Sequence, residues 1–431
     1  MPKIYFIDVT NRDGVQTARI SLSKFQKTMV NWYLSQIGIH QSEFGFPFVA
    51  HEHNYIIANL DLHRKGAFKN MILEGWCRAN AGDVRGALPT GIEHLNLSIS
   101  TSDQMIQHKF NGKLDRDSVI KEMVEAVKVA KEAGIKTIGI NAEDASRTDT
   151  EYLVEFALAG REAGAHRLRY CDTIGYETPY SMRRRLQELA ERIKMPIEMH
   201  CHNDLGMAVA NSISGARGAV EGGVDAYINT SVNGIGERAG QADLLSCILA
   251  LKFGKGYERY YEIADEIDLT AAWKLGNYVS RSFGVPIPIN QPGVGANAFA
   301  HESGIHADGA LKDRHNYELY DYNAIGRVEE VCETTGRTIH VGEYSGIAAF
   351  KHVYDQLGIS FEDEDTARYV LNLVQYANAH NQAPLTDDEL RFIAIYPDEV
   401  RKVLTINPPA PKGSEELKSV RTKGKTTVIL H

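Results

Sequence analysis

The 431-residue sequence lacks the features that mark secreted, membrane-bound and nucleic-acid-binding proteins. Its five cysteines are scattered without a C-x-x-C pair, which argues against a disulfide framework or structural zinc and favours a reducing compartment. No apolar run approaches the roughly 20 residues of a membrane helix, and no signal-peptide pattern precedes the first strand-like run. The net charge of −9 argues against nucleic acids or anionic membranes as general partners. We therefore expect a soluble, cytoplasmic protein.

Short apolar runs that indicate strands recur along the first half of the chain, and runs of helical period lie between most of them. Helix starts are marked by patterns such as the capping box at Ser23, and helix ends by Gly38, Gly134 and Gly164. The predicted strands are Ile4–Val9, His40–Phe46, Met71–Cys77, His94–Ser100, Thr137–Ala142, Arg167–Asp172, Ile197–His202 and Ala226–Val232.

Eight strand–helix units within about 240 residues fit either a closed barrel or an open doubly wound sheet. An open sheet would carry a glycine-rich phosphate fingerprint at its first turn, and Asp13-Gly14-Val15-Gln16 lacks that spacing. The number of units favours the closed form. We therefore predict a (β/α)₈ TIM barrel of the α/β class.

The alternating pattern ends near Phe283. The following stretch, 284–300, is extended and proline-rich, which predicts a linker. Helical runs follow it, including one that starts at Glu364. We expect a catalytic barrel over 1–283 and a smaller, mainly helical C-terminal region over 301–431.

Ionisable and amide side chains follow the predicted strands at their C-terminal ends, where TIM-barrel enzymes gather their catalytic groups. Solvent exposure explains any one of them, but not a polar group at every strand end. The sequence therefore predicts an active site at the barrel mouth. These residues are Arg12 with Asp13, Glu43, Arg78, Thr101 to Asp103, Glu143, Asp172 with Thr173, His200 with His202, and Asn233.

His200 and His202 lie two residues apart on one predicted strand, so both imidazoles project from the same face. Such a pair is more often structural, but the carboxylate of Asp13 shifts the balance toward a metal site. Two imidazoles and one carboxylate leave positions for a 2-oxo acid, which suits Mn²⁺ or Mg²⁺ and allows Zn²⁺ or Co²⁺. We expect support for this site from three residues of the next loop, Asn233, Glu237 and Arg238.

Six short motifs, spread between Asp8 and about Gly358, carry a resemblance to a known family. They are Arg12-Asp13-Gly14-x-Gln16, Glu143-Asp144-Ala145-Ser146-Arg147, Cys171-Asp172-Thr173-x-Gly175, His200-x-His202-Asn203-Asp204, Gly236-Glu237-Arg238-Ala239-Gly240 and His301-x-Ser303-Gly304-x-His306. The chain resembles the acyl-CoA condensing enzymes, which include 2-isopropylmalate synthase, homocitrate synthase and (Re)-type citrate synthase. The first and fourth motifs also occur in lyases and carboxyltransferases with the same metal barrel.

The resemblance implies a metal-dependent Claisen condensation of acetyl-CoA with a 2-oxo acid, followed by hydrolysis of the thioester. It implies that Asp13, His200 and His202 bind the divalent metal. It also implies that Arg12 polarises the ketone oxygen of the acceptor as that oxygen becomes an alkoxide.

For the second substrate, the resemblance implies that Glu143, His306 and Tyr317 enolise acetyl-CoA. It further implies that Thr173 binds the carboxylate of the acceptor. In relatives the segment after the barrel crosses to a partner subunit, so we expect a homodimer in which His306 serves the neighbouring site.

Oxaloacetate is the leading acceptor within this family, and it would give citrate with (Re) stereochemistry. Homocitrate formation from 2-oxoglutarate is the alternative, weakened because Gly139 stands where homocitrate synthases carry an arginine for the longer acceptor. Formation of 2-isopropylmalate is the third candidate, because we expect no leucine-sensing domain after the helical C-terminal region. An acyl-CoA lyase of the same superfamily and a non-catalytic barrel are the rivals from other classes.

A cation must bind the second carboxylate of oxaloacetate. We expect Arg78 to do so, beside a polar wall of Ser98 and Ser100, which alternate to one face of their strand. The other residues that we assign to substrate binding are Gln16, Glu43 and Arg147.

Overall fold

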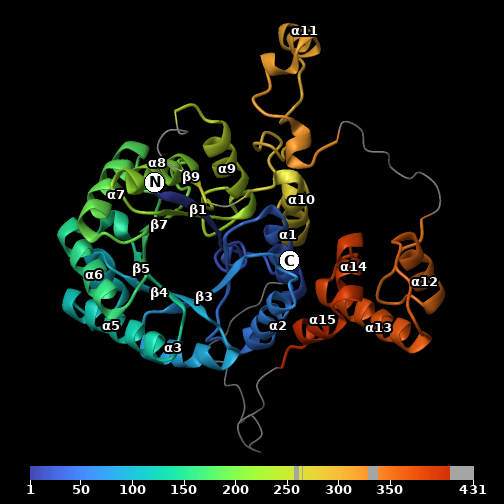
Figure 1. The fold of residues 1–431 in the computed structure, drawn as a ribbon, viewed down its shortest axis with the longest axis horizontal. Helices are drawn as coiled ribbons and strands as arrows, with labels where there is room; N and C mark the ends of the chain where they lie inside the picture. Colours follow the sequence, from blue (N-terminus) through green and yellow to red (C-terminus); the bar gives the residue numbers. More distant parts are fainter. Residues whose placement is uncertain (257–261, 265, 329–337, 408–431) are drawn as a thin grey trace, which may run out of the picture.

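Eight parallel strands close into a barrel, as the sequence predicts (Figure 1). The computed structural model describes residues 1–256, 262–264, 266–328 and 338–407. Neighbouring strands pair in chain order, and the first strand pairs with both the second and the eighth, which closes the ring. The strands are β1 (Lys3–Asp8), β2 (Gln41–Gly45), β3 (Ile72–Arg78), β4 (His94–Ser100), β5 (Thr137–Glu143), β6 (Arg167–Asp172), β7 (Ile197–Cys201) and β8 (Ala226–Thr230), with a two-residue β9 (Glu262–Ile263) beside β1.

Helices cover the outside of the barrel, and capping residues set where they begin and end. The capping box predicted at Ser23 is present, and the first helix ends at Gly38, whose φ of 85° is left-handed. The helix after the sixth strand begins at Pro179, because Thr178 caps it there. The helices are α1 (Lys24–Ile37), α2 (His53–Arg64), α3 (Ala81–Ala87), α4 (Asp103–Lys109), α5 (Arg116–Glu132), α6 (Thr150–Ala163), α7 (Pro179–Ile193), α8 (Ala208–Glu221) and α9 (Leu244–Phe253).

Paired charges fill part of the barrel interior beneath the mouth. Arg169 is fully buried, and its guanidinium nitrogens lie 2.5 Å from Glu43 and 2.5 Å from Glu198. Arg167 lies 2.7 Å from Glu198 and 3.0 Å from Glu74. Burial and the two nearby glutamates raise the pKa of Glu74 to about 7, although Arg167 opposes them. Because buried charges are tolerated only when paired, this network fixes the positions of the side chains above it.

The chain leaves the barrel through α10 (Ala272–Phe283). Residues 284–300, the expected linker, are all described and contain no helix or strand. The next helix, α11 (Gly304–Lys312), projects away from the barrel, and none of its residues is buried (Figure 1). The remaining helices are α12 (Ile347–Gln356), α13 (Glu364–Asn381), α14 (Asp387–Ile395) and α15 (Pro397–Leu404).

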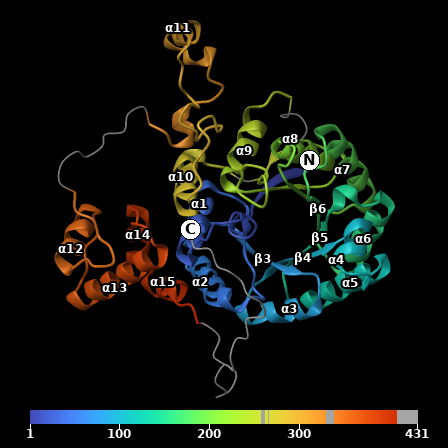
Figure 2. The ribbon, with the colours of Figure 1, turned by 180° about the vertical axis from the view of Figure 1, so that it is seen from behind.

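The last helices lie beside α1 and α2 at one side of the barrel, as Figures 1 and 2 both show. The Tyr33 hydroxyl of α1 donates to Asp388 at 2.7 Å, and Lys402 of α15 donates to Asp61 of α2 at 2.5 Å. Parts of the expected C-terminal region, 329–337 and 408–431, lie outside the described residues. No helix in the described ranges has the length and apolar character to cross a bilayer.

Candidate active site

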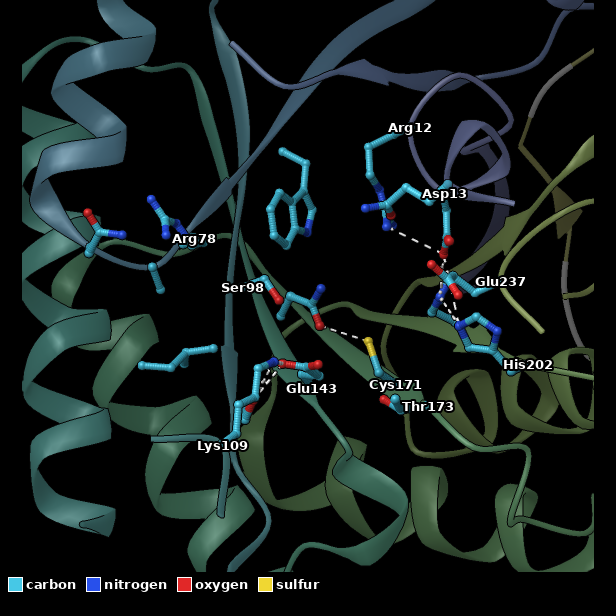
Figure 3. Close-up of a pocket in the computed structure, with 18 of the residues that line it drawn as sticks. Arg12, Asp13, Arg78, Ser98, Lys109, Glu143, Cys171, Thr173, His202 and Glu237 are labelled. Atoms are coloured by element: carbon cyan, nitrogen blue, oxygen red, sulfur yellow. Dashed lines mark hydrogen bonds and ion pairs between the residues drawn. The ribbon is translucent and has the colours of Figure 1, made fainter. Parts of the chain in front are cut away.

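A cavity of about 670 Å³ opens at the C-terminal ends of the barrel strands, where the sequence predicts the active site (Figure 3). The predicted site residues that line it are Arg12, Asp13, Gln16, Arg78, Glu143, Thr173, His200, His202, Glu237 and Arg238. Those that do not line it are Glu43, Arg147, Asn233, His306 and Tyr317.

Asp13, His200 and His202 direct their ligand atoms to one point, with all three atoms within 4.8 Å of one another. Nε2 of His200 lies 3.0 Å from Oδ2 of Asp13 and 3.1 Å from Nε2 of His202. All three residues are buried. The turn after β1 supplies the carboxylate, and alternate positions at the end of β7 supply the imidazoles, so the convergence predicted from the spacing is present.

A hydrogen bond behind His200 determines which nitrogen faces Asp13. Asn229 donates through Nδ2 to Glu198 at 2.6 Å, so its Oδ1 is an acceptor, and Nδ1 of His200, 2.7 Å away, is the donor. A neutral His200 therefore directs the lone pair of Nε2 toward the carboxylate of Asp13. Two acceptors this close repel each other unless a cation lies between them, so these residues fit a divalent metal.

The electrostatics at this cluster favour an ionised carboxylate and a neutral imidazole. Burial is the largest single effect and would raise the pKa of Asp13, but Arg12 together with His200 and His202 outweighs burial and lowers the pKa well below its usual value. Burial, followed by the neighbouring His200, lowers the pKa of His202 to about 4. These are the protonation states in which the two side chains bind metals.

Arg12 is held beside this cluster by two carboxylates. One nitrogen lies 3.4 Å from Asp13, and Nε pairs with Glu43 from below. Glu43 is fully buried, and both of its oxygens are occupied by Arg12 and Arg169. Because it lies beneath the cavity and not in it, we reassign Glu43 from substrate binding to positioning Arg12.

The Glu143 carboxylate lies in the cavity beside Lys109, apart from the metal cluster (Figure 3). Its Oε2 accepts a hydrogen bond from Ser100 at 2.5 Å and pairs with Lys109 at 2.5 Å. Ser98 and Ser100 both line the cavity, and so does Ile99 between them. No sequence pattern indicated Lys109, the last residue of α4, because that helix has only seven residues.

Thr173 and Arg238 are linked at the cavity wall. The Thr173 hydroxyl accepts a hydrogen bond from the backbone N–H of Asp144 at 2.8 Å, which fixes its orientation. Arg238 donates to the Thr173 carbonyl oxygen and to the Asp204 carboxylate, the latter at 2.9 Å through Nε. Arg238 thus ties the loop after β8 to the loop that carries Thr173.

The two arginines predicted to bind substrate differ in position. Arg78 lies at the rim of the cavity, and its side chain is 64% exposed. Its guanidinium donates two hydrogen bonds to the Asp83 carboxylate, at 2.7 and 2.8 Å. Arg147 forms an ion pair with Asp144 at 2.7 Å and does not line the cavity. Of these two arginines, only Arg78 lines the cavity, whereas Arg147 braces the loop after β5 through Asp144.

Asn233 does not support the metal cluster. It has a left-handed φ of 58°, and its amide donates to the carbonyl oxygen of Gly276 in α10 at 2.8 Å. The amide that supports His200 is Asn229, on β8 itself. An asparagine at a buried strand position is the signal that would have identified it, because a buried amide needs a polar partner.

His306 and Tyr317 lie together, but away from the cavity of this chain. Their rings stack with centroids 4.2 Å apart on α11 and the turn that follows it. His301 is close by, with Nε2 3.4 Å from Glu318. His306 and Tyr317 are therefore adjacent on the projecting segment visible in Figure 1, whereas Glu143, the third residue of the predicted group, lines the cavity.

Family comparisons divide the chain in the same two parts. Residues 3–279 match the HMGL-like family, and residues 294–381 match the family described as homocitrate synthase post-HMGL domain-like.

Three relatives are similar to this chain over nearly their full length. A citrate (Re)-synthase from Dehalococcoides mccartyi is 53% identical over 95% of this chain and 99% of its own. The 2-isopropylmalate synthase 2 of Caldanaerobacter subterraneus subsp. tengcongensis is 37% identical over 93% and 96% of the two chains. Homocitrate synthase AksA of Methanopyrus kandleri is 34% identical over 91% of each chain.

A solved structure, hydroxymethylglutaryl-CoA lyase from Pseudomonas aeruginosa, shares the fold. It matches with a TM-score of 0.54 at 18% identity, and covers 67% of this chain and 95% of the lyase. The two family models and the relatives at 34–53% identity show that this chain belongs to the HMGL-like family, among its citrate, homocitrate and 2-isopropylmalate synthases.

Proposed function

We propose that this protein condenses acetyl-CoA with oxaloacetate and hydrolyses the resulting thioester, releasing citrate and CoA. The observation that carries the proposal is the convergence of Asp13, His200 and His202 beside Arg12 at the mouth of the barrel. The choice of oxaloacetate and of (Re) stereochemistry is supported by the citrate (Re)-synthase that is 53% identical to this chain.

The acceptor binds at the metal cluster. A divalent cation held by Asp13, His200 and His202, which we propose to be Mn²⁺ or Mg²⁺, would act as a Lewis acid on the 2-oxo group. Arg12 stabilises the alkoxide that forms when the ketone carbon is attacked, and its two carboxylate partners hold it in place beforehand. The Thr173 hydroxyl, oriented by its backbone partner, binds the carboxylate next to the ketone.

The second carboxylate of oxaloacetate binds along one wall of the cavity. Arg78 and Ser98 are paired across β3 and β4, and Ser100 follows on the same face. Arg78 supplies the cation and the serine hydroxyls supply hydrogen bonds, so the wall suits a carboxylate.

Acetyl-CoA must lose a methyl proton before it can attack. The C–H bond breaks, the proton passes to a base, and the electron pair forms an enolate that attacks the ketone carbon. Glu143 is the carboxylate that this chain supplies at its own cavity for this step. Water then hydrolyses the citryl thioester and releases CoA.

We propose that the protein acts as a homodimer in which α11 of one copy completes the cavity of the other. His306 and Tyr317 stack on a projecting segment without a buried helical residue, away from the cavity of their own chain. Ile305 and Leu311 of α11 are 76% and 89% exposed. Apolar side chains that protrude in this way indicate a surface that another chain covers.

Homocitrate formation is the second candidate, supported by the homocitrate synthase that is 34% identical. A Cβ placed on Gly139 would lie 3.3 Å from the Asn96 side chain, so little room exists there for the arginine that the resemblance predicts for 2-oxoglutarate. Oxaloacetate, which is shorter by one methylene, does not need that arginine.

A thiol-release assay with acetyl-CoA and a panel of 2-oxo acids tests the proposal. We expect CoA release with oxaloacetate, abolished by chelation and restored by Mn²⁺ or Mg²⁺. His202→Ala should lose metal and activity without unfolding, because the imidazole lies at a strand end. Cleavage of 3-hydroxy-3-methylglutaryl-CoA without any condensation would contradict the proposal and favour a lyase.

A further inference from the structure

Lys109 differs from the three arginines that line the same cavity. Arg12, Arg78 and Arg238 each have a carboxylate partner outside the cavity lining, namely Glu43, Asp83 and Asp204. Arg12 also pairs with Asp13, which lines the cavity. The two groups that Lys109 contacts, Glu143 and Ser100, both line the cavity. The ion partner of Lys109 is therefore a group that faces substrate.

The Lys109 ammonium occupies one of the two carboxylate oxygens through which Glu143 could act as a base. Nζ lies 2.5 Å from Oε2 of Glu143, and the Ser100 hydroxyl donates to that same oxygen at 2.5 Å (Figure 3). With both donors in place, Oε2 has no free direction for a methyl proton of acetyl-CoA. The free enzyme therefore leaves Glu143 only Oε1 as a base, and the ion pair with Lys109 restrains the carboxylate.

The same ammonium is close to the wall that we assign to the second carboxylate of the acceptor. Nζ lies 3.1 Å from the Ser100 hydroxyl, so a carboxylate bound against Ser98 and Ser100 would lie within reach of Lys109. The lysine side chain is 49% exposed and that of Glu143 is 28% exposed. An ion pair this exposed is weak, and a flexible lysine can exchange one carboxylate for another at little cost.

We propose that Lys109 couples acceptor recognition to the release of Glu143. Without acceptor, Lys109 pairs with Glu143. When a dicarboxylic acceptor binds, its second carboxylate pairs with Lys109 in place of Glu143. Glu143, now released, accepts the methyl proton of acetyl-CoA. Lys109 is thus a specificity-determining residue, because an acceptor without a second carboxylate leaves Glu143 paired.

This inference rests on the proposed function and makes a separate prediction about proton exchange. The probe is exchange of the acetyl-CoA methyl protons with D₂O, followed by NMR on the full-length, Mn²⁺- or Mg²⁺-loaded protein. L-malate serves as a dicarboxylate that cannot condense. In the wild type, L-malate should accelerate the exchange about tenfold or more.

Lys109→Met should exchange the methyl protons rapidly without L-malate, and L-malate should add nothing. Its KM for oxaloacetate should rise, while its KM for pyruvate should change little. Lys109→Arg should restore part of the response to L-malate, because it keeps the charge. Lys113→Met, in the same loop but outside the cavity lining, is the matched control and should behave as the wild type.

Slow exchange in Lys109→Met, or stimulation by L-malate equal to that of the wild type, would overturn the role of Lys109. Such a result alongside normal wild-type condensation would leave the proposed function intact. Failure of the wild type to release CoA with every 2-oxo acid would overturn the proposed function itself. An unchanged melting temperature in Lys109→Met would show that altered exchange does not come from unfolding.

Discussion

Nδ1 of His200 lies 2.7 Å from Oδ1 of Asn229, and this contact determines the face that the imidazole presents to Asp13. Asn229 is itself fixed by Glu198, which belongs to the paired charges beneath the mouth. The orientation of His200 is therefore set from inside the barrel and not from the loops above it.

Removing the Asn229 amide should weaken metal binding. We expect Asn229→Ala to lower the affinity for Mn²⁺ by about 10–100-fold in calorimetric titrations at constant pH, because His200 loses its orienting partner. Asn233→Gly is the control, since glycine adopts the left-handed φ of 58° at that position. Equal losses of affinity in the two variants would show that the orienting contact has no special role.

His306 should act across the dimer interface. We expect His306→Ala to lower kcat by about 10²–10⁴-fold while oxaloacetate binding stays nearly unchanged, because enolisation is lost and the acceptor pocket is intact. Mixing His306→Ala with Arg12→Ala under subunit exchange should recover about a quarter of wild-type activity, since half of the dimers would contain one complete site. No recovery after verified exchange would place His306 in its own chain's site.

Arg78 should discriminate between acceptors. We expect Arg78→Ala to raise the KM for oxaloacetate about tenfold or more and to spare pyruvate, which has no second carboxylate. Arg147→Ala, which removes a guanidinium outside the cavity lining, should leave the ratio of the two KM values unchanged. A parallel rise for both acceptors in Arg78→Ala would show that Arg78 does not bind the second carboxylate.

Glu52 links α1 to the start of α2, and its contribution to stability should depend on pH. Burial would raise its pKa, but Lys27 and Lys24 outweigh burial and lower the pKa from 4.5 to about 2. A lowered carboxyl pKa stabilises the fold above pH 4.5, and this stabilisation is lost as the pH falls toward 2.

From this shift we expect Glu52→Gln to lower the free energy of unfolding at pH 7 by about 3 kcal/mol in urea titrations. The difference from wild type should narrow below pH 4.5. The control is Glu151→Gln, whose carboxylate pairs with Arg192 at the surface and should have no measurable effect. A difference that stays constant from pH 7 to pH 3 would rule out the ion pairs as its source.

The barrel could be predicted from the sequence because its strands are short apolar runs bounded by polar residues. β4 and β6 have the predicted bounds, and each other barrel strand differs from its predicted bounds by one or two residues at one or both ends. The metal cluster could be predicted for a related reason. Parallel strands place their C-terminal ends at one mouth, so Asp13 and His200 meet although they lie far apart in the chain.

The contacts that depend on loops and on packing between distant strands could not be predicted. Lys109 lies 34 residues before Glu143, at the end of a short helix without a periodic pattern, so its partner was not evident from the sequence. Glu43 follows the same polar pattern as the cavity residues, but Arg12 and Arg169 hold it beneath the cavity. Asn233 and Asn229 are close in sequence, and only the hydrogen bonds distinguish their roles.

The most direct test of the central claim is the acceptor preference of the purified, metal-loaded protein. The measurement is kcat/KM with acetyl-CoA for oxaloacetate and for 2-oxoglutarate, with the products identified by mass spectrometry. The proposed function predicts citrate as the product and a preference for oxaloacetate of about a hundredfold or more, because the longer acid misplaces its second carboxylate. Homocitrate as the main product, or equal kcat/KM values for the two acceptors, would contradict it.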